Sequence, residues 1–323
     1  MSPSPLRVLV CEYVTGGGLR GADLPASLVA EARLMRDAMV RDLSALPQPV
    51  ELLLTHDDRL AAPAPGSRPI GPGDDPFALW SALACTAHVA WPVAPETGGV
   101  LARLVRELAA SGARVAASTP AAVEIAASKH ATAARLAAAG VPHIPTFAPG
   151  EAEEALGADR ITKPDDGAGC EDTRRWPAGR RAEPGPGHVI QPYVAGEAAS
   201  LTVLMRGGEA QLLCANRQHI REVEGRLFLA GLGVGAIADD DGRLARLAQQ
   251  VANAIPGLAG IVGMDVILTA AGPVVVEVNP RLTTAYAGLA AALGINPAGL
   301  LPEFGAAGSG PAPRARTVEM GLA

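Results

Sequence analysis

The chain has 323 residues, a formal net charge of −6 and a sequence pI near 5.6. This length predicts two or three packed modules, and the 49% hydrophobic content excludes a disordered chain. The acidic balance argues against a nucleic-acid partner, and no apolar run is long enough to span a membrane. No signal-peptide pattern opens the chain and its four cysteines form no CxxC pair, so we expect a cytoplasmic protein with free thiols.

The first third of the chain alternates strands with helices. We expect strands at residues 6–13, 50–54 and 87–91, and helices at 25–43, about 77–85 and about 97–111. A loop rich in proline and glycine fills residues 61–76. This alternation predicts a parallel, doubly wound sheet, and we assign it to a domain of residues 1–112.

A run of three glycines, Gly16 to Gly18, follows the first strand. Dinucleotide-binding folds need the spacing G-x-G-x-x-G with a helix immediately after it, and neither condition is met. The run is interpreted either as a loop that lets the backbone approach a small ligand or as an ordinary flexible connection.

From residue 113 the pattern changes. A helix is expected over 119–140, strands at 159–164 and 188–194, a hairpin over 200–220 that turns at Gly207–Gly208, and a helix at about 240–254. The end of the chain, residues 306–323, is rich in glycine, proline and alanine, and we expect it to be loosely held.

The segment 263–281 carries the strongest pattern. The strands MDVIL and VVVEV are joined by turn-like residues 269–273, which predicts Leu268 opposite Val274 and Asp265 opposite Glu277. Asn279 then points to the same face as Glu277. Oxygen ligands that converge in this way suit Mg²⁺, although two exposed edge-strand charges are an equally simple interpretation. Arg281 follows and could contact an anion.

Lysine is nearly absent from the chain, because only Lys129 and Lys163 occur among 27 Lys and Arg residues. Lys163 lies in ITKPDDGAGC, where a strand leads into a glycine-rich loop. This arrangement aims an ammonium group and backbone amides at phosphate oxygens.

These segments together resemble the ATP-grasp superfamily over residues 115–305. Lys129 in ASKHATAARLAAAGVP, Lys163 in ITKPDDGAG, the hinge VIQPYVAGEAAS and the strands GMDVIL…VVVEVNPR occur in the order of the family's motifs. The resemblance implies a Rossmann-like domain followed by a two-lobed ATP-grasp fold, which is α/β overall and α+β in the ATP-grasp part. Its lobes would span residues 113–190 and 191–305.

The resemblance also implies roles for individual residues. The cofactors would be ATP and Mg²⁺ (or Mn²⁺), with the metal on Asp265, Glu277 and Asn279 and with Arg281 and Lys163 in catalysis. ATP would contact Lys129, Lys163, Gly167, Gly169, Gln191, Tyr193, Val194 and Glu197. Glu197 is a departure, since family members commonly place a ribose-binding glutamate where Gly196 aligns Ala198.

Three stretches, VLVCEYVTGGGL, CANRQHI and VEVNPRLTTAYAGL, resemble predicted carboligases related to the tyramine–L-glutamate ligase of methanofuran-type cofactor synthesis. The activity implied is an ATP-dependent carboxylate–amine ligation through an acyl phosphate, with glutamate and tyramine as the lead pair of small-molecule substrates. Candidate substrate residues lie on loops near the expected cleft: Glu12, Gly17, Gly18, Asn216, Arg217, Thr283 and Tyr286. Glu31 is interpreted as a packing or surface residue, and a homodimer is expected by analogy.

Two other interpretations stay open. The chain could be a catalytically silent ATP-binding module of the same fold, which amine-dependent phosphate release would exclude. It could also be a nicotinamide oxidoreductase, which would require binding of NAD and no binding of ATP.

Overall fold

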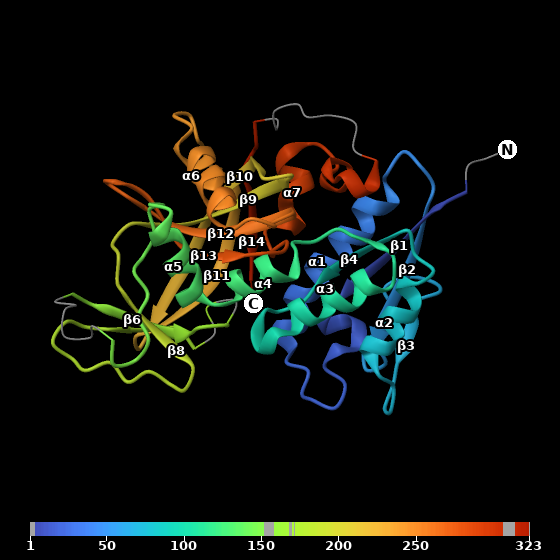
Figure 1. Cartoon of the computed structure of the whole chain (residues 1–323), viewed down its shortest axis with the longest axis horizontal. Helices are drawn as coiled ribbons and strands as arrows, with labels where there is room; N and C mark the ends of the chain where they lie inside the picture. The colour runs from blue at the N-terminus through green and yellow to red at the C-terminus, as the bar shows by residue number, and fades with distance from the viewer. Residues whose placement is uncertain (1–3, 152–157, 168–169, 171, 306–313, 323) are drawn as a thin grey trace.

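The computed structural model describes residues 4–151, 158–167, 170, 172–305 and 314–322. Figure 1 shows two halves side by side, one built from the first strands and helices and the other from most of the remaining chain. Within the described ranges, no helix has both the length and the hydropathy needed to cross a membrane. All four cysteines carry free thiols, as expected.

The N-terminal half is a five-stranded sheet in the order β3-β2-β1-β4-β5, with every pair parallel. Its strands are β1 (Leu6–Glu12), β2 (Val50–Asp57), β3 (Arg68–Ile70), β4 (Val89–Val93) and β5 (Arg114–Val115). Its helices are α1 (Ala26–Ser44), α2 (Pro76–Ala84) and α3 (Val100–Ala110), with the short turns η1 (Val14–Gly18) and η2 (Thr97–Gly99). The predicted parallel sheet is confirmed, whereas β3 lies in the stretch expected to be only a loop.

The second half is an antiparallel sheet in the order β13-β12-β9-β10-β11-β7-β6-β8. A small lobe holds β6 (Arg160–Pro164), β7 (Arg174–Trp176) and β8 (His188–Pro192). A large lobe holds β9 (Glu197–Arg206), β10 (Glu209–Val223), β11 (Arg226–Ile237), β12 (Gly260–Thr269) and β13 (Gly272–Asn279). Among the described strands, one pairing, Arg174 of β7 with Arg226 of β11, joins the lobes directly. The segment 143–147 also connects them, because it bridges to Val275 of β13 and to Ile190 of β8.

Helices cover the large lobe on both faces. They are α4 (Pro120–Ala127), α5 (Lys129–Ala138), α6 (Arg243–Ala254) and α7 (Tyr286–Leu293), followed by the turns η4 (Pro297–Leu300) and η5 (Pro302–Phe304). The single helix expected over 119–140 is two helices, because Ser128 adopts an extended backbone (φ −97°, ψ 119°) and its hydroxyl accepts a hydrogen bond from the Ala131 amide.

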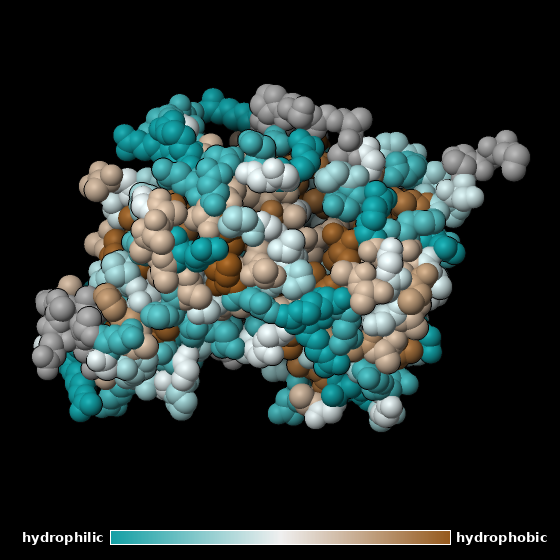
Figure 2. Space-filling view, in the orientation of Figure 1, coloured by the Kyte–Doolittle hydropathy of each residue, from teal (hydrophilic) through white to brown (hydrophobic). Residues whose placement is uncertain are grey.

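The main hydrophobic cluster crosses from one half to the other. It joins β1, β4 and α1 to α7 and to η5, and Trp91 packs against both Tyr286 and Phe304. A second cluster lies between the large lobe and α4, α5 and α6. In Figure 2, hydrophilic residues cover much of the visible face and hydrophobic residues appear between them in separate patches.

The end of the chain differs from expectation. Val318–Gly321 form β14, which pairs antiparallel with β11, so the prediction of a loosely held end does not hold for these residues. Residues 306–313 lie outside the described ranges. Met320 explains part of the anchoring, since its sulfur lies close to Gly288 of α7.

Candidate active site

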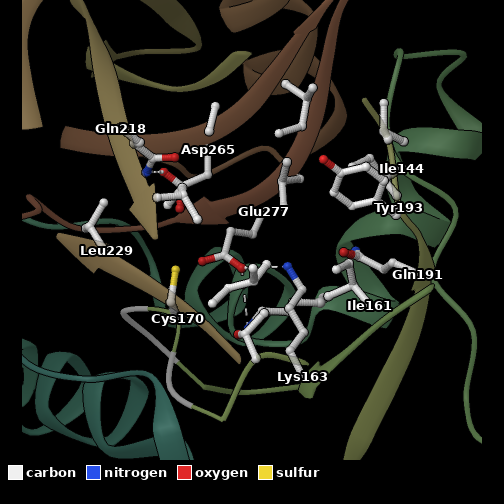
Figure 3. A pocket seen from close by; sticks show the side chains of 18 of the residues that line it. Ile144, Ile161, Lys163, Cys170, Gln191, Tyr193, Gln218, Leu229, Asp265 and Glu277 are labelled. Carbon is white, nitrogen blue, oxygen red and sulfur yellow. Dashed lines mark hydrogen bonds and ion pairs between the residues drawn. The ribbon is translucent and has the colours of Figure 1, made fainter. Parts of the chain in front are cut away.

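A cavity lies between the two lobes and contains most of the predicted nucleotide contacts (Figure 3). One wall comes from β6, β8 and the residues just after β8, and the other from β9 to β13. Predicted site residues among its lining are Lys129, Lys163, Gly167, Gln191, Tyr193, Val194, Asp265 and Glu277. The structure therefore brings together residues from sequence positions almost 150 apart.

The carboxylate pair forms as predicted, although by a different register. Asp265 pairs with Glu277 across β12 and β13. Leu268, however, faces Pro273, and a β-bulge between Asp265 and Val266 restores the register. The turn is shorter than predicted, and the bulge compensates for that error.

Two ammonium groups approach Glu277. The Nζ atom of Lys163 lies 3.1 Å from Glu277 Oε2, and that of Lys129 lies 3.6 Å from the same oxygen. Burial alone would raise the pKa of Glu277, but the two lysines outweigh it and hold the pKa below its usual value. Burial and the neighbouring charge of Glu277 raise the pKa of Asp265. The pair is thus electrostatically unequal.

Lys129 is positioned by the break between α4 and α5. It is the first residue of α5, and its backbone amide donates to Asp165 O at 3.1 Å. Its Nζ atom donates to Asp165 O at 3.2 Å and to Gly167 O at 2.6 Å. A Cβ atom on Gly167 would lie 2.8 Å from Pro164 Cβ, so the loop needs glycine there. Gly169 lies outside the described residues.

The opposite end of the cavity is suited to an adenine ring. Gln191 is 2% exposed, and its Nε2 donates to the Thr146 hydroxyl at 2.8 Å, which leaves its oxygen as an acceptor. Tyr193 and Val194 follow on the same wall. The Arg175 guanidinium lies 3.9 Å from the Tyr193 ring centroid and holds that ring in place.

The structure shows where the two hinge residues that differ from the family pattern lie. Ala198 lines the cavity, whereas Glu197 is exposed and forms an ion pair with Arg217. Successive strand residues point to opposite faces, which explains why a shift of one position removes the carboxylate from the cavity.

A second cavity adjoins the first and lies between the two halves of the chain. Gln218, Leu229, Asp265 and Glu277 line both cavities, so the carboxylate pair is their common boundary. The second cavity is also lined by Glu12, Glu31, Ser200, Asn279, Arg281, Thr283 and Thr284. Arg281 of this lining pairs with Glu96 of the N-terminal half, and its Nη2 atom lies 2.8 Å from Glu96 Oε2.

Comparison with known proteins agrees with this geometry. The ATP-grasp domain profile matches residues 126–285, and the profile of the pre ATP-grasp 3 domain matches residues 50–123. The chain belongs to the ATP-grasp superfamily.

Solved structures share the ATP-grasp fold over nearly the whole chain. An ATP-grasp superfamily protein from Archaeoglobus fulgidus has a TM-score of 0.75 at 21% identity, covering 97% of this chain and 91% of that one. A Campylobacter jejuni biotin carboxylase in complex with a β,γ-ATP ligand has a TM-score of 0.69 at 16% identity (95% and 72% covered). A Bacillus licheniformis L-amino acid ligase has a TM-score of 0.61 at 14% identity (94% and 74% covered).

A curated relative is more similar in sequence over a shorter stretch. The tyramine–L-glutamate ligase of Methanocaldococcus jannaschii is 33% identical over 102 residues. The match covers 31% of this chain and 31% of the relative.

The residues predicted to contact substrate fall into two groups. Glu12 and Thr283 line the second cavity. The other candidates do not line it: Gly17 lies against Ile70, Gly18 against Tyr13, Arg217 pairs with Glu197, and Tyr286 is fully buried in the main cluster. Asn216 lies behind the cavity wall, where its amide donates to Ser200, a lining residue, and to Thr202. The glycine run is therefore a packed turn in this structure.

Sequence reasoning missed three residues of the site. The Gln218 Nε2 atom donates to Asp265 Oδ1 at 2.9 Å, Glu96 holds Arg281, and Glu31 lines the second cavity although it was interpreted as a packing or surface residue. Gln218 is two residues after Asn216 on β10, so period-two alternation on that strand was the available signal. Glu96 and Glu31 had no such signal, because both reach the site through the contact between the two halves.

The donor set fits a magnesium ion. Asp265 and Glu277 are two opposed carboxylates, and burial together with the charge of Glu277 raises the pKa of Asp265. Asn279 reaches Asp265 through its amide nitrogen at 3.4 Å, so its amide oxygen is not used in that contact. Among described residues, no group of three or more His, Cys, Asp and Glu side chains could hold a metal. Mg²⁺ commonly uses only one or two carboxylates and takes its other ligands from water and phosphate.

Proposed function

We propose that this protein is an ATP-dependent ligase that joins a carboxylate to an amine through an acyl phosphate. One observation carries the proposal: the chain's two lysines converge on a carboxylate pair that forms the boundary between two cavities. Phosphoryl transfer needs positive charge and positioning more than covalent chemistry from the protein, and this boundary supplies both.

In this proposal the first cavity binds ATP. The Gln191 oxygen accepts a hydrogen bond from the adenine amino group, and Tyr193 and Val194 line the same wall. Lys129 and Lys163 contact the phosphates, and the loop at Gly167 closes over them. The contacts of both ammonium groups with Glu277 support this proposal, because they place the two charges at one end of the cavity.

The second cavity receives the carboxylate and the amine. Mg²⁺ on Asp265, Glu277 and Asn279 would neutralise phosphate charge when bound. Arg281 lies in the wall beside these residues and stabilises the anion that develops on the reacting carbonyl. The cavity lies between the two halves, and its walls reduce the access of water to the acyl phosphate. Residues 1–112, 113–190 and 191–305 serve as the three modules of this ligase.

Glutamate and tyramine are the lead substrates. The support is the similarity to the Methanocaldococcus jannaschii ligase that is named for them, which spans under a third of either chain. A catalytically silent ATP-binding module is the second candidate. Ala198 favours it, because this residue leaves no carboxylate for the ribose at that position of the cavity wall.

The test is phosphate release from Mg-ATP with a panel of amino acids crossed with amines, starting with glutamate and tyramine. We expect release only when an acid and an amine are both present, together with ADP and an amide product by mass spectrometry. ATP binding without any turnover across the panel would contradict the ligase and support the silent module.

A further inference from the structure

One face of α1 forms a wall of the second cavity. Leu28, Glu31, Ala32 and Met35 all line this cavity, and their spacing of three and four residues places them on one side of the helix. Three of the four are apolar. Glu31 is therefore the single charged group on a hydrophobic helix face, and this face comes from the N-terminal half and not from the ATP-grasp lobes.

Glu31 has no ion pair among the described residues, unlike Glu277 and Arg281. Glu277 faces Lys129 and Lys163, and Arg281 pairs with Glu96. Glu31 receives one neutral hydrogen bond, from the Thr284 hydroxyl at 3.2 Å, and no described cationic side chain forms an ion pair with it. A partly buried carboxylate in an apolar wall gains from a cation that enters the cavity.

Glu31 is also close to the reacting end of the site. The pKa of the Cys170 thiol is raised to about 12, first by burial and then by the charges of Glu277, Asp265 and Glu31. The charges of all three carboxylates therefore act on this thiol. Cys170 lines the first cavity, and together with Glu31 it lines a further hollow beside α1 and β11.

We propose that Glu31 binds the amino group of the acceptor amine and that the apolar face of α1 holds an apolar body attached to it. This inference rests on the proposed ligase function and adds the residues that would recognise the amine, a primary ammonium on a hydrophobic carbon skeleton such as that of tyramine. It also assigns the selection of that amine to the N-terminal half.

The chemistry balances with Glu31 as the first proton acceptor. The ammonium group gives a proton to the Glu31 carboxylate, and the free amine attacks the carbonyl carbon of the acyl phosphate. A carbon–nitrogen bond forms, the carbon–oxygen bond to phosphate breaks, and inorganic phosphate leaves with the electron pair. The amide nitrogen loses one further proton, which phosphate takes, and Glu31 returns its proton to water.

The test separates the two half-reactions with hydroxylamine, a small nucleophile that needs no apolar subsite. The full chain is given Mg-ATP and glutamate with either hydroxylamine or tyramine, and hydroxamate and amide are measured. For Glu31→Gln we expect hydroxamate formation within about twofold of the unmodified protein, amide formation at least tenfold slower, and a raised KM for tyramine only. Glu51→Gln, an exposed glutamate on β2, is the matched control and should change neither product.

Two results would overturn the inference. In one, hydroxamate and amide fall together in Glu31→Gln, or the KM for glutamate rises, which would place Glu31 at the acid. In the other, Glu31→Gln leaves the amide rate unchanged. Thr284→Val is a second variant that leaves the carboxylate in place, and it should lower the amide rate less than Glu31→Gln does.

The inference can be tested even if the ligase proposal fails. If the unmodified protein forms neither hydroxamate nor amide, binding of tyramine and of its alcohol analogue 2-(4-hydroxyphenyl)ethanol is compared by calorimetry. We expect tyramine alone to bind more weakly to Glu31→Gln, by about tenfold. Equal affinities of the two compounds for the unmodified protein would contradict an ammonium site at Glu31.

Discussion

At the scale of single residues, the charge balance of the site depends on two lysines beside the carboxylate pair. Lys163 and Lys129 are 8% and 6% exposed, and both lie near one oxygen of Glu277. Arginine makes up the rest of the 27 Lys and Arg residues, yet a compact ammonium fits between a carboxylate and a phosphate where a planar guanidinium does not. Each lysine is therefore expected to matter individually.

We predict that Lys163→Met lowers turnover by at least about 100-fold, because a buried charge aimed at the transferring phosphate is lost. The fold should persist, since Lys129 still faces Glu277. Steady-state phosphate release and circular dichroism would measure the two effects. Arg243→Met is the control, because Arg243 pairs with Asp241 on the surface and should leave turnover unchanged. Turnover of Lys163→Met equal to that of the unmodified protein would exclude the assigned role.

The residues of the nucleotide end could be predicted from sequence because each lies within a short local pattern. Lys163 lies near the end of a strand that leads into a glycine-rich loop, and Asp265 and Glu277 occupy two strands joined by a turn. Gln218 and Glu31 could not be predicted in this way. The place of Gln218 depends on the strand order β12-β9-β10, and that of Glu31 depends on how α1 packs on the large lobe. Both are tertiary facts.

At the scale of elements, the break between α4 and α5 shows how local chemistry sets the position of Lys129. Ser128 ends one helix and caps the next, so the following residue begins α5 beside the loop at Asp165. Alanine-rich sequence on both sides hides this break, because helix propensity is high throughout. The local signal for this break was Ser128, a residue type that favours the N-cap position, and the prediction of a single helix did not use it.

The strand register gives a second lesson at this scale. The turn between β12 and β13 is tighter than predicted, and an extra residue in β13 returns Asp265 and Glu277 to opposite positions. Pattern alone specifies which face a side chain occupies more strongly than it specifies the length of a turn. The bulge was not predictable from the apolar run that surrounds it.

We predict that Ser128→Ala destabilises the protein by about 1 kcal/mol, because α5 loses its N-cap. The KM for ATP should also rise, because the first turn of α5, which includes Lys129, becomes less ordered. Asp75→Ala is the matched control. Asp75 caps α2 by accepting hydrogen bonds from the Phe77 and Ala78 amides, away from either cavity. The two variants should lose similar free energy of unfolding in urea, whereas only Ser128→Ala should change the KM. An equal rise in the KM for ATP in both variants would show that the change follows from lower stability in general.

At the scale of the whole molecule, the two halves share one hydrophobic cluster. Trp91 of the parallel sheet meets Tyr286 edge to face at a centroid distance of 5.7 Å and Phe304 at 5.2 Å. The second cavity lies along the same contact, with α1 on one side and the carboxylate pair on the other. The walls of the second cavity and the stability of the molecule therefore depend on the same contact between halves.

This arrangement predicts that the two halves unfold together. Tyr286→Ala removes a fully buried ring from the shared cluster, and we expect the free energy of unfolding to fall by about 3–5 kcal/mol in a single transition. Hydrogen exchange should then accelerate in β1 of the N-terminal half as well as in α7. Tyr286→Phe keeps the ring and should cost at most about 1.5 kcal/mol. It should also leave the KM of both substrates unchanged, because the structure places Tyr286 in the core and not in the cavity wall. Two separate transitions for Tyr286→Ala, or faster exchange confined to α7, would show that each half is stable without the other.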